Sequence, residues 1–309
     1  KENIISYNVE EDLVDGQHTV KIQIKDTLGN LSEKEWKFTV GEVSKNLYFG
    51  QLHSHTNLSD GQGTVDEAYQ YAENVAKVDF LAVTDHSNWF DNDTKANIAD
   101  GSASTEWKLG RDTANKYNQN GKFVAIYGYE MTWSGSTGGY GHMNTFNTEG
   151  FETRSNNKMN LENYYKALKT QPQSLSQFNH PGKTFGDFSD FAHYDKEIDK
   201  VINLIEVGNG EGEIRSSGYF PSYEYYTRAL DKGWHVAPSN NQDNHKGKWG
   251  NANTGRTVIE ASDLSRESIY DAIRNMRVYA TEDENLRISY EVNNNTCLLY
   301  TSPSPRDTR

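Results

Sequence analysis

The chain has 309 residues, of which 44 are acidic and 31 basic, so its formal net charge is −13 at pH 7. This balance argues against a general nucleic-acid-binding protein, because such proteins need a basic face. An aromatic content of 12% excludes a disordered chain. No apolar run reaches the roughly 18 residues that span a membrane. We therefore expect a folded protein with no nucleic-acid partner and no membrane span.

The first 43 residues are expected to form a partial immunoglobulin-like β module. Residues 18–25 and 33–40 alternate polar and apolar side chains, as half-buried strands do, and residues 26–30 between them are rich in turn formers. The pair resembles the last hairpin of a β-sandwich from a bacterial surface protein. It therefore predicts a bacterial protein with an extracellular or cell-surface location.

The C-terminal residues lie outside the expected catalytic domain. Residues 286–296 are predicted to begin a further β segment, because 286–292 read LRISYEV. From Cys297 onward the sequence resembles the translation of a sequencing adapter, so residues 297–309 are predicted to be an adapter-derived tail. Without that tail the chain has no cysteine, which excludes thiol catalysis, disulfides and Cys-ligated zinc. The chain begins with lysine, and we expect it to be an internal piece of a longer protein.

Residues 44–285 alternate strand and helix patterns. Short buried strands are predicted at 47–52, 78–84, 123–128, 142–146, 174–179, 201–207 and 235–238. Helices are predicted at 65–76, 105–119, 160–170, 221–232 and 265–275. This alternation predicts an α/β fold with a largely parallel sheet, and about seven such units suit a barrel better than an open sheet.

Histidine and carboxylate side chains gather at the ends of these predicted strands. Two pairs have the spacing i, i+2, which points both side chains to one side of an extended chain. The nine candidates are His53, His55, Asp60, His86, Glu130, His142, His180, Asp243 and His245.

Parallel barrel strands deliver their carboxyl ends to one rim, so we expect these nine side chains to meet there. Without cations, many of them would repel one another or stay unpaired at a high cost. Imidazole and carboxylate together suit Zn, Mn or Fe, and nine ligands exceed the need of one ion. The sequence thus predicts two or three divalent metal ions.

The motifs HSH (53–55), SDG (59–61), TDH (84–86) and DNH (243–245), with Glu130, His142 and His180, resemble the polymerase-and-histidinol-phosphatase (PHP) metallohydrolase family. Within it, the chain is similar to the secreted bacterial branch of the carbaryl-hydrolase type. The resemblance implies a distorted barrel of about seven strands with a trinuclear site. It implies three ligand sets, of which the first two share Glu130: His53, His55, Glu130 and Asp243; Glu130, His142 and His180; and Asp60, His86 and His245.

The leading functional hypothesis is hydrolysis of a small phosphate mono- or diester by a metal-bridging hydroxide held by Glu130, Asp243 and His180. Arg215, Arg256, Lys183 and Lys246 are candidate substrate-binding cations. One alternative is an amide or carbamate hydrolase on the same metals, since the same activated water attacks a carbonyl. Another is a cell-surface binding module whose metals are structural.

Aromatic residues near the motifs have two interpretations. Either they form the walls of a pocket for an apolar or cyclic leaving group, or they pack the rim of the barrel. These residues are Trp89, Phe90, Trp133, Tyr140, Tyr219, Phe220 and Trp249.

Overall fold

The computed structural model describes residues 13–14, 16–40, 46–156, 159–288, 291–292 and 295–296. The chain divides into two compact units, Lys1–Lys45 and Asn46–Arg309, and each is described by itself. The predicted adapter-derived tail lies outside the described residues. No helix in the described part is both long and apolar enough to cross a membrane.

The first unit holds one antiparallel hairpin, formed by β1 (Gly16–Lys25) and β2 (Leu31–Val40). Its turn is held by Asp26, whose Oδ1 accepts the backbone N–H groups of Leu28 at 2.9 Å and Asn30 at 2.8 Å. Gly29 takes a φ of 92°, which favours glycine. Both predicted strands are therefore present. Their immunoglobulin-like character is not confirmed, because these are the two strands among the described residues of this unit.

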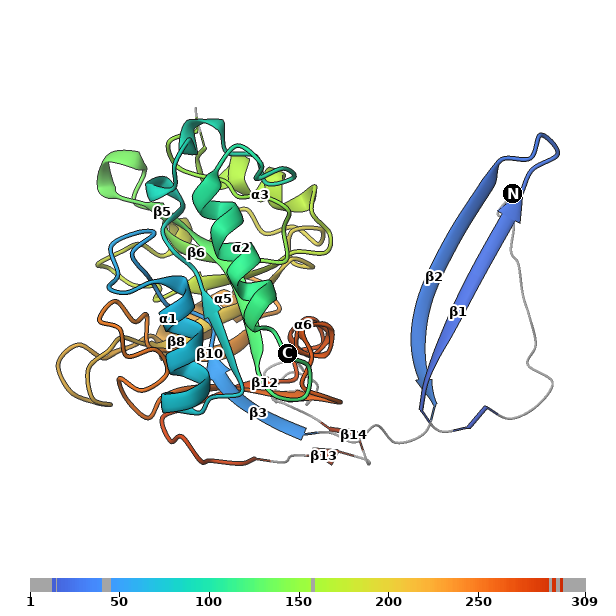
Figure 1. Ribbon diagram of the computed structural model, residues 1–309. Coiled ribbons are helices and arrows are strands. Elements are labelled where there is room, and N and C mark those ends of the chain that lie inside the picture. The colour runs from blue at the N-terminus through green and yellow to red at the C-terminus, as the bar shows by residue number, and fades with distance from the viewer. Residues whose placement is uncertain are drawn as a thin grey trace. The chain divides into compact units, whose positions relative to one another are not determined.

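The second unit interleaves strands and helices along the chain (Figure 1). The strands are β3 (Asn46–Gln51), β4 (Phe80–Val83), β5 (Val124–Trp133), β6 (Gly141–Phe146), β7 (Leu175–Asn179), β8 (Ile202–Asn209), β9 (Phe220–Pro221), β10 (Ala237–Asn241), β11 (Arg256–Ala261), β12 (Val278–Thr281), β13 (Glu291–Val292) and β14 (Asn295–Thr296). The helices are α1 (Val65–Tyr71), α2 (Thr105–Tyr117), α3 (Leu161–Lys169), α4 (Phe188–Phe191), α5 (Tyr223–Asp231) and α6 (Arg266–Arg274), with single helical turns at Ala72–Ala76, Ser87–Trp89, Asp93–Lys95 and Gly135–Thr137.

One mixed sheet organises this unit, in the order β10-β8-β7-β6-β5-β4-β3-β11-β12, with β9 paired to β8. All seven predicted strands are present, as β3 to β8 and β10. The expected seven-stranded count is not confirmed, because β9, β11 and β12 join the same sheet. The prediction of a largely parallel sheet is also only partly correct. β6 runs antiparallel to β5 and β7, since the connection at 134–140 is too short for a parallel crossover.

The sheet curls into a half-barrel, and hydrogen bonds bridge its open side. The Asn240 N–H on β10 donates to Thr257 Oγ1 on β11 at 3.1 Å. The Leu52 N–H, just after β3, donates to Asn241 Oδ1 at 2.7 Å. A parallel bridge between Ser54 and Asn244 extends this contact beyond the strand ends. The segments that follow β3 and β10 therefore meet, although no regular ladder joins the two strands.

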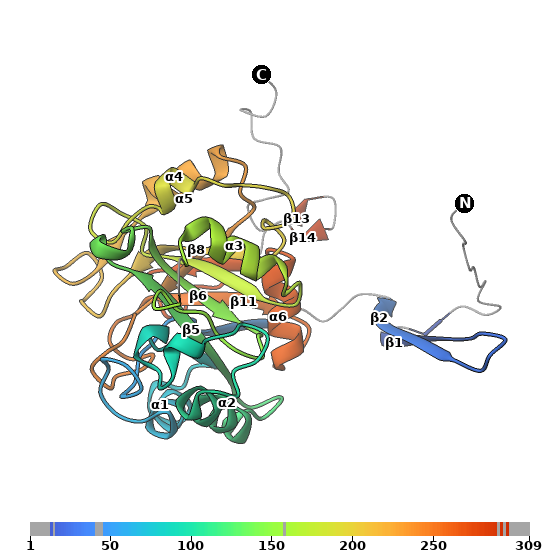
Figure 2. The ribbon, with the colours of Figure 1, turned by 90° about the horizontal axis from the view of Figure 1, so that it is seen from above.

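Two hydrophobic layers enclose the sheet. On its outer side, buried aromatic residues such as Trp107 of α2 and Tyr129 of β5 form the larger cluster. α1 and α2 lie side by side on one flank, and α4 and α5 lie on the opposite flank (Figure 2). Inside the curl, Ile269 and Ile273 of α6 pack against Val124 of β5 and its neighbours. This inner cluster fills the end of the half-barrel where β5 begins, so the opposite end is left for polar side chains.

Candidate metal centre

The alternation of β5 and β6 aims two of the candidate ligands into the half-barrel. Val124 and Ile126 of β5 belong to the inner apolar cluster. Glu130 is four residues beyond Ile126 and therefore points to the same side. In β6, Phe146 belongs to the inner cluster, so His142 points inward by the same rule. The apolar end of each strand thus sets the direction of its polar end.

β7 and β8 place a buried polar layer between the inner cluster and the ligands. Leu175 of β7 and Leu204 of β8 pack in the inner cluster. Two and four residues after Leu175 come Gln177 and Asn179, and two residues after Leu204 comes Glu206. All three of these polar side chains are at most 1% exposed. A polar layer this deep needs hydrogen-bond partners, and the ligands above it supply several of them.

The remaining candidates follow strand ends, and the structure brings all nine together. His53 and His55 follow β3, His86 follows β4, His180 follows β7, and Asp243 and His245 follow β10. Asp60 lies in the turn after His55. The nine fall into four groups whose ligand atoms lie within 4.8 Å of one another. These groups are His53, His55 and Glu130; His53, His180 and Asp243; Glu130, His142 and His180; and His55, Asp60, His86 and His245.

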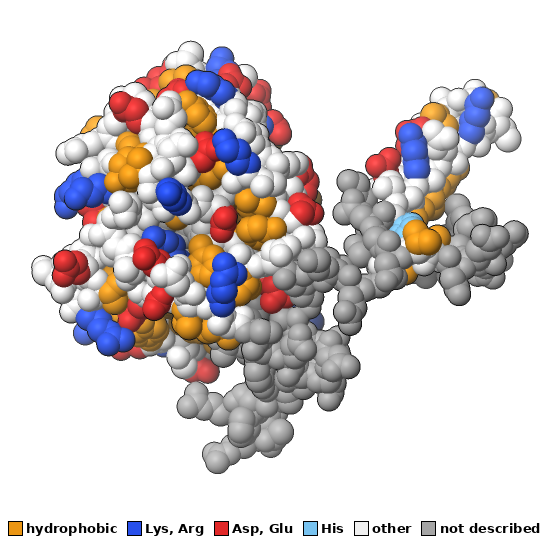
Figure 3. All heavy atoms as spheres, turned by 60° about the horizontal axis from the view of Figure 1, so that its bottom comes forward, with side chains coloured by type: hydrophobic (Ala, Val, Ile, Leu, Met, Phe, Trp, Pro, Cys, Tyr) orange, Lys and Arg blue, Asp and Glu red, His pale blue; other side chains and the backbone are white. Residues whose placement is uncertain are grey.

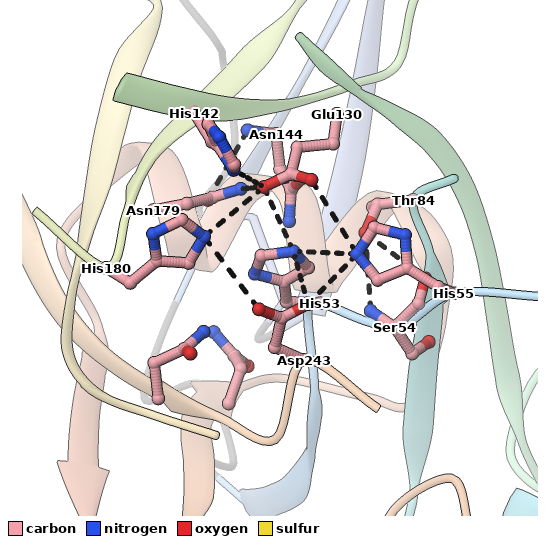
Figure 4. Close-up of polar contacts among 12 residues, drawn as sticks. His53, Ser54, His55, Thr84, Glu130, His142, Asn144, Asn179, His180 and Asp243 are labelled. Atoms are coloured by element: carbon pink, nitrogen blue, oxygen red, sulfur yellow. Dashed lines mark hydrogen bonds and ion pairs between the residues drawn. The ribbon is translucent and has the colours of Figure 1, made fainter. Parts of the chain in front are cut away.

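His53, His55 and Glu130, together with Asp243 of the neighbouring group, form a central group of two imidazoles and two carboxylates around one point (Figure 4). The Nε2 atoms of His53 and His55 lie 3.2 Å apart. The Oδ1 atom of Asp243 lies 3.1 Å from the first of these nitrogens and 2.9 Å from the second. The Oε1 atom of Glu130 lies 3.2 Å from His53 Nε2. Ligands at zinc-bond length in a tetrahedron stand about 3.3 Å apart, which matches this spacing.

Glu130 connects the central group to a second one on its other side. The Nδ1 atom of His142 lies 3.3 Å from Glu130 Oε1, and the Nε2 atom of His180 lies 3.5 Å from the same oxygen. The two imidazole rings meet edge to face, with centroids 4.8 Å apart. In Figure 4 both rings flank the Glu130 carboxylate. One carboxylate is therefore placed to serve two groups.

The third group lies nearer the surface. Asp60 Oδ1 lies 3.2 Å from His245 Nε2 and 3.6 Å from His86 Nε2. The His245 ring stacks on His55 with centroids 4.1 Å apart. A hydrogen bond from His245 lowers the pKa of Asp60 to about 2. Burial opposes protonation of His245, yet its bond to Asp60 and the charge of Asp243 raise its pKa to about 9.

Burial and nearby charges shift the pKa values of the two central imidazoles, His53 and His55, in opposite directions. Burial disfavours the protonated form of His53, but the charges of Asp243, Glu206 and Glu130 together raise its pKa well above the usual value. Burial and the nearby charge of His86 lower the pKa of His55 to about 3. His55 is thus a neutral imidazole across the physiological range. His53 must release its Nε2 proton before that atom can bind a cation.

The buried atoms of this centre fit divalent cations. Among the described residues, Glu130 Oε2, Asp243 Oδ1 and His180 Nδ1 are buried and make no hydrogen bond, although imidazole nitrogens lie 2.7 Å and 2.9 Å from the first two. Leaving such atoms unpaired is costly, and a cation between the carboxylates and imidazoles removes that cost. The donor set of nitrogen and carboxylate oxygen is the one that Zn, Mn and Fe accept. The identity and number of the ions stay predictions.

Glu206 is a buried carboxylate that the sequence analysis missed. Its Oε1 atom lies 3.0 Å from His53 Nδ1 and accepts a hydrogen bond from Asn241 Nδ2 at 3.0 Å. Its Oε2 atom accepts the His180 backbone N–H at 2.8 Å and Asn209 Nδ2 at 2.9 Å. Glu206 thus holds two of the candidate ligands: it contacts the ring of His53 and the backbone N–H of His180.

Asp85 plays a similar part for the segment after β3. Its carboxylate is fully buried and accepts the Thr56 N–H and the Thr56 hydroxyl, each at 2.7 Å, and the Ser59 hydroxyl at 2.6 Å. Burial raises the pKa of Asp85, and these hydrogen bonds oppose that rise. The segment that carries His55 and Asp60 is therefore fixed to the end of β4.

Backbone strain accompanies two of the candidate ligands. His180 has a φ of 27° and Asp243 a φ of 49°. Non-glycine residues adopt this region rarely, at a cost of about 1–3 kcal/mol each. The surrounding hydrogen bonds, including that of the His180 N–H to Glu206, hold these residues in place. Such strain is typical of functional sites.

The four candidate substrate-binding cations occupy different positions. Lys246 borders a cavity beside Asp243 and pairs with Glu211 at 3.0 Å. Arg215 is exposed and pairs with Glu282 at 3.0 Å. Arg256 is buried and pairs with Glu284, whereas Lys183 is exposed in the segment between β7 and α4. Their role in substrate binding stays a prediction.

Most of the aromatic candidates pack the rim. Four of them are buried, with exposures of 1–6%: Phe90, Trp133, Tyr219 and Trp249. Tyr140 is half-buried and Trp89 is exposed. Phe220 differs from the others because it lines the cavity beside Asp243.

No family model matches the chain, and no curated protein matches its sequence. Solved structures do resemble it. A two-domain protein from Bacteroides vulgatus, containing a predicted PHP-like metal-dependent phosphoesterase, is 19% identical, with a TM-score of 0.53 over 77% of this chain and 66% of that one. A complex of endonuclease Q with a 27-mer duplex substrate bearing an abasic lesion is 13% identical, with a TM-score of 0.46 over 79% and 62%. Endonuclease Q from Pyrococcus furiosus is 13% identical, with a TM-score of 0.44 over 76% and 58%.

The second unit therefore has the fold of a PHP-like phosphoesterase, and the likeness expected from the motifs is confirmed at the level of the fold. The chain spans about 66% of the length of that first structure. The comparisons do not single out the carbaryl-hydrolase-type branch, which stays a prediction.

The expected absence of a nucleic-acid partner is contradicted, because two of these similar structures are endonucleases and one of them holds a duplex substrate. Net charge cannot decide this point, because it averages over the whole molecule, whereas nucleic-acid binding depends on local groups and bound metals. On the face shown in Figure 3, basic and acidic side chains are interspersed.

Proposed function

We propose that the second unit is a metal-dependent phosphoesterase that hydrolyses a small phosphate mono- or diester. The observation that carries this proposal is a set of four overlapping ligand groups, in which Glu130, His53, His55 and His180 each belong to two groups. Several buried atoms of these groups make no hydrogen bond. Divalent cations bound there would activate water and neutralise phosphoryl oxygens. The fold of a PHP-like phosphoesterase supports the same activity.

The residues of this chain supply position and shielding. Glu206 receives the His53 Nδ1–H and so directs Nε2 of the same ring toward the central group. The Asn179 side chain donates to Glu130 Oε1 at 2.8 Å and fixes the carboxylate that two groups share. α6 and the inner apolar cluster close the far end of the half-barrel, so water and substrate reach the ligands from the rim.

The test compares nitrophenol release from a nitrophenyl phosphate, a bis-nitrophenyl phosphate and a nitrophenyl carbamate. Each assay uses metal-stripped protein and the same protein with Mn or Zn restored. Asp243→Asn is the site variant, and Asp112→Asn, at an exposed position of α2, is the matched control. We expect metal-dependent release from a phosphate ester that Asp243→Asn abolishes and Asp112→Asn retains.

Two results would contradict the proposal. Release from the carbamate alone would identify an amide or carbamate hydrolase on the same groups. Retention of bound metal with no release from any substrate would favour a binding module whose metals are structural. The choice between mono- and diester follows from the first two substrates.

A further inference from the structure

A cavity of about 370 Å³ opens directly beside the candidate metal centre. Two candidate ligands, Asp243 and His245, border it on one side. Phe185, Phe220 and Lys246 are among the residues on its other walls. A cavity that touches ligand side chains is where the non-reacting part of a substrate lies when its phosphoryl group reaches the metals.

Two phenyl rings face this cavity although burial would stabilise them. Phe220 of β9 is 54% exposed and Phe185 is 41% exposed. Burying the exposed part of a phenylalanine ring is favourable, so two half-exposed rings at one cavity offer apolar surface that a ligand can cover. The Phe185 ring also packs on the His180 ring, with centroids 4.6 Å apart, and therefore stands next to the reacting position.

The polar wall of the cavity carries no unpaired charge among its described residues. The Lys246 ammonium pairs with Glu211 Oε2 at 3.0 Å. The other oxygen of Glu211 accepts the backbone N–H groups of His245 and Lys246. The lysine and the glutamate thus neutralise each other, so Lys246 is not a free cation for a second anionic group on the substrate.

We propose that this cavity holds the leaving group of the substrate, and that this group is an uncharged aromatic ring. The inference rests on the proposed phosphoesterase function and names its substrate class as aryl phosphate esters. Hydrolysis forms a bond from the water oxygen to phosphorus and breaks the bond from phosphorus to the phenolic oxygen. The protons of the water are shared between the released phosphate and the released phenol.

The first experiment measures binding without turnover. Phenylphosphonate and methylphosphonate are titrated by calorimetry into metal-loaded protein and into the variants Phe220→Ala, Phe220→Leu and Leu109→Ala. Phe220 is the better site than Phe185 because Phe185 touches candidate ligands. Leu109 of α2 is 53% exposed and lies outside the cavity, so it is the matched control for loss of an exposed apolar side chain. Metal content is measured for every variant.

We expect wild-type protein to bind phenylphosphonate at least tenfold more tightly than methylphosphonate. Phe220→Ala should reduce that preference about tenfold, Phe220→Leu should reduce it less, and Leu109→Ala should retain it. A second experiment follows kcat/KM for phenyl phosphate and ethyl phosphate. Each ester is compared between wild type and Phe220→Ala, so differences in intrinsic reactivity cancel, and the phenyl-to-ethyl ratio should fall about tenfold in the variant.

The two proposals fail separately. Equal affinity for the two phosphonates, or a preference that Phe220→Ala leaves intact, overturns the aromatic leaving-group site even if both esters are hydrolysed. Tight, Phe220-dependent binding of phenylphosphonate with no hydrolysis of either ester by metal-loaded protein supports the aromatic site and overturns the phosphoesterase function.

Discussion

The Nδ1 atom of His53 lies 3.0 Å from Oε1 of Glu206, and both side chains are fully buried. A carboxylate can only accept here, so the Nδ1 atom carries the proton and the Nε2 atom is the one that faces the other candidate ligands. Because Glu206 also accepts the His180 backbone N–H, one carboxylate orients residues from three of the four candidate metal-binding groups.

Replacing Glu206 by Gln should weaken metal binding, since the amide adds a donor at a place where five donors already converge. Loss of such supporting carboxylates typically lowers metal affinity 10–100-fold. Zinc titration against a competing chelator measures this loss. Glu197→Gln, at an exposed residue that pairs with Lys200, is the control and should bind zinc as the wild type does. An unchanged zinc affinity in Glu206→Gln would show that His53 needs no such support.

Metal removal should destabilise the second unit. A bound ion at 100 times its Kd adds about 2.7 kcal/mol to the folded state, which corresponds to a rise in Tm of roughly 5–10 °C for a unit of this size. We expect chelator-stripped protein to recover this difference on addition of Zn or Mn. His55→Ala should recover less of it, because His55 belongs to two of the groups. Scanning calorimetry with and without metal provides the measurement, and equal Tm values would contradict metal binding by the folded protein.

Asp85→Asn should loosen the segment that carries His55 and Asp60. The variant places an amide donor against the Thr56 and Ser59 donors, and an unsatisfied buried group costs about 1–3 kcal/mol. Urea unfolding should report that loss of stability, and metal content should fall as well. Asp112→Asn, on the exposed face of α2, should change neither quantity. Full stability in Asp85→Asn would mean that the segment after β3 is held by other contacts.

Asp91 should stabilise the start of α2 in a pH-dependent manner. Its carboxylate accepts the Glu106 N–H at 3.0 Å and the Ser104 hydroxyl at 2.6 Å. Burial alone would raise the pKa of Asp91, but the hydrogen bonds from Glu106, Ser104 and Thr105 lower it overall. The folded-state pKa is thus below the unfolded value, so the contribution is complete above about pH 4 and is lost as the pH falls below it.

Asp91→Ala should therefore cost about 1 kcal/mol at pH 7, a usual value for a lost helix cap. Below pH 4 the difference in unfolding free energy between wild type and variant should shrink. Urea unfolding of both proteins at pH 7 and pH 3 measures the two differences. A difference that stays constant with pH would show that the ionised carboxylate is not responsible.

Seven of the nine ligand candidates lie beside a strand end, and the i, i+2 spacing of His53 and His55 fixes their direction locally. The other two are Asp60, which lies in a turn, and Glu130, which lies within β5 although it was predicted to end its strand. Glu206 was missed because it lies inside a strand rather than at its end. A signal was present: a single carboxylate in the apolar run INLIEVGN is costly unless it is paired. Apart from Asn209 in the same strand, its partners lie in β7, in β10 and in the segments that follow β3 and β7, and no local pattern names those.

The parallel sheet was an overgeneralisation of the strand–helix alternation. The β5–β6 connection contains only a short turn at Gly135–Thr137, so the reversal there could have been inferred from the glycine-rich sequence. The pairing of β11 with β3 could not, because it brings Thr257 opposite Gly50 across most of the chain. Local propensity predicts that strands exist, whereas their neighbours in the sheet depend on the packing of the whole unit.

The hydrogen bond between Leu52 and Asn241 joins residues 189 positions apart in the sequence. Loops of that length close late in folding, because their entropy must be lost before their contacts contribute stability. His53 and Asp243 flank this contact, so the central metal group assembles when β10 docks against the segment after β3. Metal capture during refolding would then report the docking of β10 against the segment after β3, and a folding intermediate without docked β10 would bind metal with too few ligands to retain it.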